Sequence, residues 1–425
     1  MRLLTLAWHS LVNRSFAVIL TVMTIAFSIG LLVMVDQLRQ EVREGFYRSV
    51  SGVDLIVGAR TAPIQLLLYS VFGVGSATNN IDWETFQELQ RQPEVDWAVP
   101  MALGDSHQGY RVMGTTRAFF EQFKVGDQEG LVIQYGQPAT AVFEDLFEVV
   151  IGAQVAKQLG YTLGDEIVLS HGTGRVSLQS HDALPFKVTG VLAPTGTPID
   201  QQLFVSLRAH RALHVGWESG VQRPGAGLDQ ESARQSADAL QPETLTAIFL
   251  GLKTRAAVFG LQRRVNEYRV EPLSAIIPGI TLQELWRISG VAEQILRVVA
   301  ALVVLTGLLG MLTVLLTTLN ERRREMAILR ANGARPHHIA MLLVMEAGLI
   351  ALAGIVLGVA LALMAQWALA PVLLDRLGIY LSLQWPALWQ WGVLGGIWVA
   401  GLLVALVPAS LAYRRTLADG MQVRS

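Results

Sequence analysis

The chain has 425 residues, of which 52% are hydrophobic and only 16% are charged. A soluble domain usually carries about 25% charged residues, so the composition indicates membrane-embedded segments. The formal net charge of −1 argues against the basic surface that nucleic-acid binding requires. The absence of cysteine excludes disulfides and thiolate metal sites.

Four long apolar runs dominate the chain, and each has the length of about 20 residues that a helix needs to cross a bilayer. We predict transmembrane helices at residues 15–36, 291–320, 339–365 and 390–412. The first run is longer than the apolar core of a signal peptide, which has roughly 7–15 residues, and so predicts an uncleaved anchor. Residues 1–14 have the apolar spacing of an amphipathic helix in the inner interface, although a plain extension of the first span fits equally.

Residues 37–290 are too polar to be embedded in lipid and long enough to form a core of their own. Short apolar stretches with strand and helix character alternate there, which predicts an α+β domain. We expect Gly216–Gln241 to be a loop, because it is rich in Gly, Pro, Ser and Gln. The predicted fold class is therefore a four-helix membrane protein with a large α+β domain inserted between helices 1 and 2.

The arginines of the short segments predict the orientation, because positive residues favour the cytoplasmic side. Those before the first span, between spans two and three and after span four are Arg2, Arg14, Arg322, Arg323, Arg324, Arg330, Arg335, Arg414, Arg415 and Arg424. The segment between spans three and four, residues 366–389, carries only Arg376. Both termini, the segment 321–338 and the tail 413–425 are thus predicted to be cytoplasmic. Trp367, Trp385, Trp389 and Trp391 are typical of a headgroup boundary.

The cytoplasmic segment after the second span reads ERRREMAILRANGA over residues 321–334. Its spacing predicts that the second span continues as a helix and turns at Gly333, with Pro336 opening the next helix. Ile328 and Leu329 are apolar on a segment that leaves the membrane, so they require a partner surface. A cluster of arginines that only fixes the topology is the alternative.

This segment resembles the signature of the FtsX-like/MacB-type ABC transporter permease family, the type VII ABC superfamily with MacB, LolC, LolE and FtsX. The ending VPASLAYRR at residues 407–415 and the opening LLTLAWHSL at residues 3–11 are similar to those of the family. The stretch from Ile151-Gly152 to Gly164-Asp165 is similar to part of the MacB-like periplasmic core domain. The resemblance extends over the whole chain.

The resemblance implies a permease subunit that transmits ATP-driven conformational change from a separate cytoplasmic ATPase to the periplasmic domain. The expected role is the extraction of a lipoprotein or lipid, or the export of a periplasmic substrate. The alternative is a non-transporting FtsX/BceB-like regulator that activates a cell-wall hydrolase or senses a peptide. The residues expected to couple to the ATPase are Glu321, Arg322, Arg324, Glu325, Ile328, Leu329, Arg330 and Gly333.

The expected partners are an ABC ATPase dimer, a second permease copy or paralogue, membrane lipid and a periplasmic or outer-membrane protein, without nucleic acid. The expected location is the inner membrane. The sequence contains no G-x-x-x-x-G-K-[ST] phosphate loop and no metalloprotease or serine-hydrolase motif. We therefore name no catalytic, cofactor or metal residue and expect a non-catalytic subunit, with ATP and Mg²⁺ on the partner ATPase.

Two features of residues 37–290 are candidates for further contacts. The apolar run Ile64–Gly75 is too short to cross a bilayer and is either a core helix or a surface for substrate or partner; its candidate contact residues are Leu66, Leu67, Leu68, Tyr69 and Phe72. His210 and His214 are spaced to bind a transition metal from one helix, but no third ligand can be named beside them.

Polar and small residues in or beside the predicted spans indicate contacts between helices. Glu293 and Arg297 are spaced as an i,i+4 pair at the membrane edge. Glu346 is expected to be an interfacial carboxylate that faces another helix. The spacings Gly354-x-x-x-Gly358 and Gly392-x-x-x-Gly396 would allow a neighbouring helix to approach closely.

Overall fold

The computed structural model describes residues 11–12, 15–126, 128–172, 183–216, 227–321, 328, 331–377 and 383–419. The chain divides into two compact units. One contains the four apolar helices, and the other contains residues 42–289 together with a short segment beginning at Val372.

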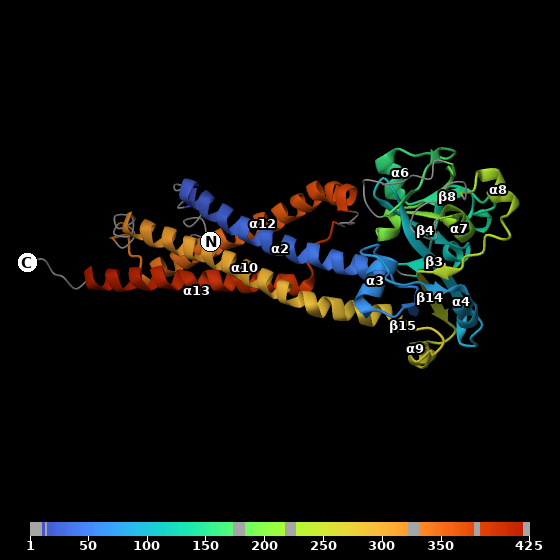
Figure 1. The fold of residues 1–425 in the computed structure, drawn as a ribbon. Coiled ribbons are helices and arrows are strands. Elements are labelled where there is room, and N and C mark those ends of the chain that lie inside the picture. The colour runs from blue at the N-terminus through green and yellow to red at the C-terminus, as the bar shows by residue number, and fades with distance from the viewer. Residues whose placement is uncertain are drawn as a thin grey trace, which may run out of the picture. The chain divides into compact units, whose positions relative to one another are not determined.

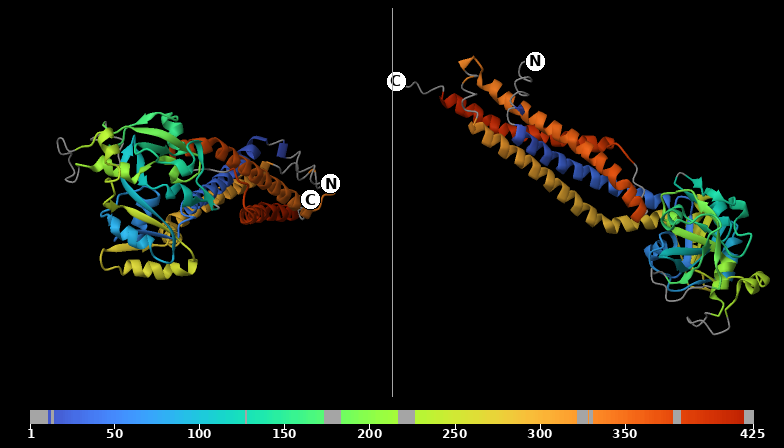
Figure 2. Two further views of the ribbon diagram at one scale, coloured as in Figure 1. Left: turned by 90° about the vertical axis from the view of Figure 1, so that its right-hand side faces the viewer. Right: turned by 90° about the horizontal axis from the view of Figure 1, so that it is seen from above.

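The four apolar helices are α2 (Ser15–Arg48), α10 (Pro278–Glu321), α12 (Pro336–Leu377) and α13 (Leu388–Asp419). Each is long and apolar enough to cross a membrane, by length and composition. They run alongside one another as a bundle in both Figure 1 and Figure 2. The helices extend beyond the apolar runs, because polar residues at their ends keep the helical conformation. At 1.5 Å per residue, α10 is about 66 Å long, roughly twice the thickness of a hydrocarbon core.

The bundle is held by apolar side chains on the facing sides of its helices. Buried residues from all four helices form one cluster, which includes Ile29, Met311, Ile350 and Ala405. The outward sides are apolar as well, for example at Leu302 and Val356. A helix that is apolar all round suits a lipid environment.

The second unit is built on a mixed sheet, labelled in part in Figure 1. Among the described residues eleven strands join it, in the order β15-β1-β14-β3-β4-β12-β8-β11-β7, with β10 on β3 and β9 on β11. Of the strand pairs within the described part of this sheet, only β12–β4 and β11–β8 are parallel. The strands are β1 (Leu55–Ala59), β3 (Val95–His107), β4 (Tyr110–Thr115), β7 (Ile133–Gly136), β8 (Glu148–Ile151), β9 (Glu166–Ile167), β10 (Ser170–His171), β11 (Phe186–Leu192), β12 (Gln202–Ser206), β14 (Ala247–Leu252) and β15 (Leu273–Ile276).

Helices cover both faces of this sheet and create separate apolar cores. The side chains of β1 alternate, so that Ile56 points into one core with α3 and α5, while Leu55 and Val57 point into another with α4 and α9. A third core lies under α6, α7 and α8. The helices are α3 (Pro63–Val71), α4 (Trp83–Gln90), α5 (Ala118–Gln122), α6 (Ala153–Leu159), α7 (Leu207–His214), α8 (Gln230–Gln235) and α9 (Val258–Asn266).

Short elements complete the domain. The strand pairs are β2 (Ile81–Asp82) with β13 (Thr244–Leu245), and β5 (Lys124–Val125) with β6 (Glu129–Gly130). Single turns of 3₁₀ helix occur at Ala139–Ala141, Pro198–Gln201 and Arg255–Ala257. The domain is therefore α+β, as the alternation of short segments predicted.

Candidate functional site

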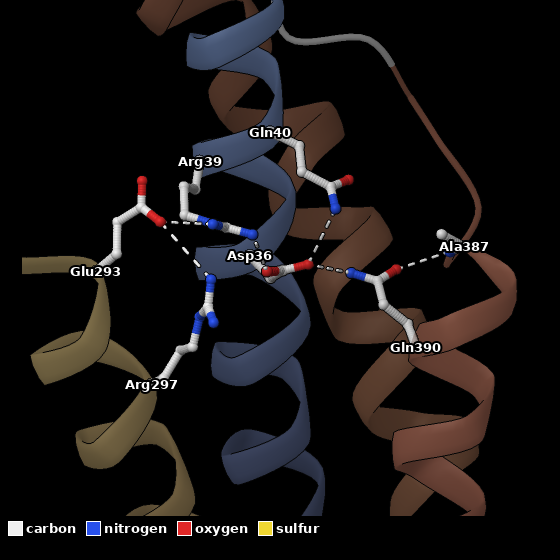
Figure 3. Close-up of polar contacts among 7 residues, drawn as sticks. All are labelled: Asp36, Arg39, Gln40, Glu293, Arg297, Ala387 and Gln390. Atoms are coloured by element: carbon white, nitrogen blue, oxygen red, sulfur yellow. Dashed lines mark hydrogen bonds and ion pairs between the residues drawn. The ribbon is translucent and has the colours of Figure 1, made fainter. Parts of the chain in front are cut away.

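A polar cluster, which we call the clasp, joins three helices of the bundle through Asp36, Arg39, Glu293, Arg297 and Gln390 (Figure 3). Arg39 Nη1 of α2 lies 2.7 Å from Glu293 Oε2 of α10, and its Nη2 lies 3.1 Å from Asp36 Oδ1. Gln390 of α13 donates from Nε2 to Asp36 Oδ2 at 2.7 Å. One arginine thus bridges two carboxylates, and the carboxylate of Asp36 links α2 to α13.

The central ion pair of the clasp is shielded from its surroundings, because the side chains of Arg39 and Glu293 are 22% and 18% exposed. Arg297 Nη2 lies 3.7 Å from Glu293 Oε2, which confirms the pair that the sequence indicated. Arg39, however, is the nearer partner. Charge-assisted hydrogen bonds of this kind fix geometry as well as adding stability.

Amide side chains extend the polar network to α12. Gln37 donates to the carbonyl of Gln384 at 3.0 Å, and Gln366 of α12 donates to Gln37 Oε1. Gln37 and Gln366 are both buried. Hydrogen bonds between buried amides favour one arrangement of the helices. All four helices, or the segments adjoining them, therefore contribute to polar contacts at one end of the bundle.

Glycines bring α2 and α12 into close contact along the apolar part of the bundle. A Cβ added at Gly358 would lie 2.8 Å from the carbonyl oxygen of Ala26, and one at Gly354 would lie 2.5 Å from Ile25 Cγ2. This confirms the close approach that the first glycine spacing predicted. The second glycine spacing is different, since a Cβ at Gly392 or Gly396 would meet no atom of the described residues within 4 Å.

Most of the predicted coupling residues lie outside the part of the chain that the structure describes. The coupling residues that are not among the described residues are Arg322, Arg324, Glu325, Leu329 and Arg330. Glu321 is the last residue of α10, but its side chain is not described either.

Ile328 and Gly333 can be placed. Ile328 is 54% exposed, and its carbonyl accepts a hydrogen bond from the amide of Asn332 at 3.1 Å. Gly333 has φ +90°, a conformation that glycine adopts without strain. The chain thus turns at Gly333, before α12 begins at Pro336. Leu319, Ile339, Leu343, Ala409 and Ala412 form a small apolar cluster beside this turn.

An aromatic group occurs in the second unit, where the end of α2 and the start of α10 belong to it. The rings of Phe46 and Phe72 are stacked with centroids 4.3 Å apart. Phe46 also meets Trp286 edge to face at 5.3 Å. Such pairs add to the stability from area burial. The end of α2, the start of α10 and the residue after α3 are thereby packed together.

The candidate contact residues of the apolar run Ile64–Gly75 divide into two sets. Leu66, Leu67 and Tyr69 are buried in the domain's core, so the contact prediction fails for these three side chains, because α3 covers the sheet with them. Leu68 and Phe72 are partly exposed, and a contact with substrate or partner through them remains a prediction.

Two further predictions concern the boundary of the bundle. The four tryptophans Trp367, Trp385, Trp389 and Trp391 are exposed on the bundle, as side chains at a headgroup boundary are. Glu346 is buried, so its carboxylate faces neighbouring helices rather than the surroundings.

The sequence pattern revealed only Glu293 and Arg297 of the clasp. The clasp joins residues more than 250 positions apart in the chain, and local spacing does not indicate such contacts.

Comparisons with known proteins match both parts of the chain. Residues 18–263 match the family of the MacB-like periplasmic core domain, and residues 297–417 match the FtsX-like permease C-terminal family. Two curated relatives are the macrolide export ATP-binding/permease proteins MacB of Wolinella succinogenes, 28% identical over 35% of this chain, and of Nitrosomonas europaea, 26% identical over 54%. The aligned segments cover 22% and 32% of those two proteins.

Solved structures also align with part of the chain. The periplasmic region of MacB from Actinobacillus actinomycetemcomitans is 10% identical over 56% of this chain and 97% of its own length, with a TM-score of 0.33. The extracellular domain of the noncanonical ABC-type transporter YknZ from Gram-positive bacteria is 12% identical over 52% of this chain and 98% of its own, with a TM-score of 0.30.

Four membrane-capable helices and an α+β domain of the MacB-like type define a multi-pass permease of the ABC transporter class. The chain belongs to the FtsX/MacB-type ABC permease family, since the MacB-like model covers more than half of it and the FtsX-like model covers its C-terminal helices.

Proposed function

We propose that this chain transmits the conformational change of a separate cytoplasmic ATPase to its own MacB-like domain on the other side of the membrane. The observation that carries the proposal is α10, a continuous helix from Pro278 in the domain to Glu321 at the coupling segment. A continuous helix is stiff along its axis because each turn is hydrogen-bonded to the next. A push on the segment after Glu321 would therefore displace the start of the same helix.

The clasp gives this displacement a path between helices. Because Arg39 binds Glu293, movement of α10 acts on α2 through this charge-assisted contact, and Arg39 also holds Asp36 within α2. Both helices continue into the second unit, where Phe46 and Trp286 are in ring contact. Two helices would thus deliver the movement to the domain together.

The coupling segment is the proposed docking surface for an ABC ATPase dimer, which would hold the ATP and Mg²⁺. Ile328 supports this, because an apolar side chain that is 54% exposed beside a run of arginines favours a protein partner. The residues proposed to couple are those from Glu321 to Gly333 named above. A second permease copy or a paralogue would complete the transporter.

The orientation follows from the arginine distribution. We propose an inner-membrane protein with both termini and residues 321–338 in the cytoplasm and the domain of residues 37–290 in the periplasm. The exposed tryptophans near the segment 366–389 would then mark the outer boundary of the membrane.

The substrate would be handled outside the inner membrane, by extraction of a lipoprotein or lipid or by export of a periplasmic compound. The curated relatives carry the name of macrolide exporters. The alternative remains a non-transporting regulator that acts on a cell-wall hydrolase or senses a peptide. A co-purifying outer-membrane or adaptor protein would favour transport, and a co-purifying hydrolase or kinase would favour regulation.

The orientation can be tested directly because the chain contains no cysteine. We would introduce Asn332→Cys and Asp96→Cys separately, both at exposed positions, and label intact cells with a membrane-impermeant maleimide that passes the outer membrane. Asp96→Cys should react, and Asn332→Cys should react only after lysis. Labelling of both from the same side would refute the proposal.

The coupling is tested by co-purification of the full chain in mild detergent. An ATPase subunit with a phosphate loop should co-purify with the native chain, and Ile328→Asp should remove it. Asn332→Asp is the matched control, since it adds the same charge four residues further at an exposed, already polar position. If Ile328→Asp and Leu329→Asp both left ATPase binding and activity intact, the proposed docking surface would be wrong.

A further inference from the structure

One buried carboxylate in the MacB-like domain is surrounded by three histidines. Asp105 is 1% exposed. His171 Nδ1 lies 2.9 Å from Asp105 Oδ1, His214 Nε2 lies 3.7 Å from the same oxygen, and His210 Nε2 lies 3.6 Å from Oδ2. The ligand atoms of Asp105, His171 and His214 all lie within 4.8 Å of one another.

The sheet brings Asp105 and His171 together. The two residues are direct partners in the antiparallel β10–β3 pair. The register between β3 and β4 shifts between Leu103 and Ser106, which places an extra residue of β3 around Asp105. Bulges of this kind re-aim a side chain and occur next to functional sites.

Helix α7 supplies the other two histidines. His210 and His214 are one turn apart, with ring centroids 4.5 Å from each other, and His214 also meets His171 at 4.7 Å. The helix can lie this close to the sheet because Gly114 of β4 has no side chain: a Cβ there would be 2.8 Å from His210 Cβ. The fold therefore positions all four residues from three elements.

The hydrogen bonds define which nitrogen of His214 faces the carboxylate. Its Nδ1 lies 2.7 Å from the carbonyl oxygen of His210. A carbonyl only accepts, so Nδ1 carries the proton and donates it. In the neutral ring, Nε2 then presents its lone pair toward Asp105 Oδ1. Two acceptors that face each other at this distance repel unless a cation lies between them.

We propose that Asp105, His171 and His214 bind one divalent transition-metal ion of the Zn²⁺ class, with His210 beside them as a fourth ligand. Imidazole and carboxylate are the ligands of such ions, and two histidines at i and i+4 on one helix face are a recurring arrangement. In a tetrahedral Zn²⁺ site with bonds of about 2.0–2.1 Å, neighbouring ligand atoms lie about 3.3 Å apart. The distances from 2.9 to 3.7 Å around Asp105 bracket that value.

The charges of the group agree with this proposal. Burial disfavours the ionised form of Asp105, but the hydrogen bond from His171 and the charges that His214 and His210 carry when protonated outweigh it and lower the pKa of the carboxyl to about 2. The carboxylate is therefore ionised at neutral pH and requires a positive partner. The backbone hydrogen bond of His214 is the kind of outer contact that orients a metal-bound imidazole.

A bound ion would tie β3, the short strand β10 and α7 to one another. This role is independent of the coupling proposed above, because none of the four residues belongs to the helices of the bundle. His181 lies outside the described residues and is not part of the proposed site.

The test uses the full chain in detergent, purified through a tag without histidines and stripped with a chelator. Titration with Zn²⁺ should give one equivalent per chain that survives desalting, and it should raise the temperature of unfolding, because the ion binds the folded state. Binding should weaken in acid, because protons compete with the ion for the imidazole nitrogens.

Variants identify the ligands. Asp105→Asn and His214→Gln should each lower the affinity for Zn²⁺ by about 100-fold or more, beyond what outer contacts contribute. His107→Gln is the matched control: His107 is another buried histidine on β3, and it contacts Val168 and Tyr161 at 2.7 Å and 2.9 Å. The His107→Gln variant should still bind one Zn²⁺ per chain.

If a variant does not fold, the native chain alone decides the question. Co²⁺ should then give the visible absorption of a tetrahedral nitrogen and oxygen site, and Zn²⁺ should displace it. The proposal is wrong if the stripped native chain retains no Zn²⁺ after desalting and its unfolding temperature does not change when Zn²⁺ is added. The four residues would then form a hydrogen-bonded Asp–His network only. Equal binding by Asp105→Asn would likewise overturn the proposal.

Discussion

Arg39 of α2 and Glu293 of α10 are 254 positions apart in the chain, and their side chains meet at 2.7 Å. The same guanidinium also holds Asp36, to which Gln390 donates. An ion pair that is shielded and shares partners in this way is coupled far more strongly than one on an open surface.

Breaking the clasp should therefore destabilise the bundle measurably. We expect Arg39→Ala and Glu293→Gln each to lower the free energy of unfolding, with a coupling of about 0.5–3 kcal/mol between them in a double-mutant cycle. Thermal unfolding of the full chain in detergent measures it.

The exposed pair of Arg287 and Glu284 on the same helix, 4.0 Å apart, is the control for the clasp. Glu284→Gln should change the free energy of unfolding by no more than about 0.5 kcal/mol. Additive effects of Arg39→Ala and Glu293→Gln would show that the two residues do not act together.

The turn at Gly333 gives a second prediction. Because φ is +90° there, Gly333→Ala should strain the backbone by about 1 kcal/mol or more and should reduce ATPase stimulation by the permease. Gly333→Asn should retain more of that stimulation, since asparagine tolerates a left-handed conformation better than alanine. Equal activity of both variants and the native chain would show that the turn geometry does not matter for coupling.

The glycines of α12 and α13 give a third prediction, because a Gly→Ala substitution should change the stability of the bundle differently at the two sites. Gly358→Ala would place a methyl group 2.8 Å from the carbonyl oxygen of Ala26, so it should destabilise the bundle by about 1–3 kcal/mol through overpacking. Gly392→Ala meets nothing within 4 Å and should be neutral or stabilise α13 by up to about 1 kcal/mol. Unfolding temperatures of the two variants, compared in one detergent, decide whether the α2–α12 contact is as close as described.

The Asp105 carboxylate gives a fourth prediction, on acid sensitivity in the presence of a chelator. Its pKa in the folded chain is about 2, below its ordinary 3.8. Because the carboxyl has a lower pKa in the folded chain than in the unfolded chain, its ionisation stabilises the fold at a pH above the unfolded-state pKa. This stabilisation is lost as the pH falls toward 2. The groups that face this carboxylate are His171, His210 and His214.

The unfolding temperature of Asp105→Asn should therefore lie furthest below that of the native chain at a pH above 3.8, the ordinary pKa of the carboxyl. The difference should narrow as the pH falls from 4 toward 3. A difference that stays constant over this interval would contradict the role assigned to the carboxylate.

Hydropathy and local motifs predicted the four helices and the family, because both depend on residues close together in the chain. The α+β character of the domain followed from short alternating segments. Helix α8 was missed, since Gly216–Gln241 was expected to be a loop. Asp229 nevertheless caps α8, accepting from the amide of Ser232 at 2.8 Å, and Asp229-x-x-Ser232 before helix-forming residues was the available signal.

The sites could be predicted only in part, because they depend on contacts between distant segments. The i,i+4 spacing indicated Glu293 with Arg297, but nothing local indicated Arg39. His210 and His214 were recognised as a pair on one helix, whereas Asp105 and His171 meet them only through the β10–β3 register. The burial of Leu66 and Leu67 was likewise undecided until the sheet beneath α3 was known.

The contact between Phe46 and Trp286, with centroids 5.3 Å apart, has a consequence for the ancestry of such chains. It places the entry and the exit of the MacB-like domain next to each other. A domain whose two ends are adjacent can be exchanged as a cassette without rearranging the segments that carry it. A single recombination event that replaces the MacB-like domain would therefore give the same membrane helices a different domain and a different function.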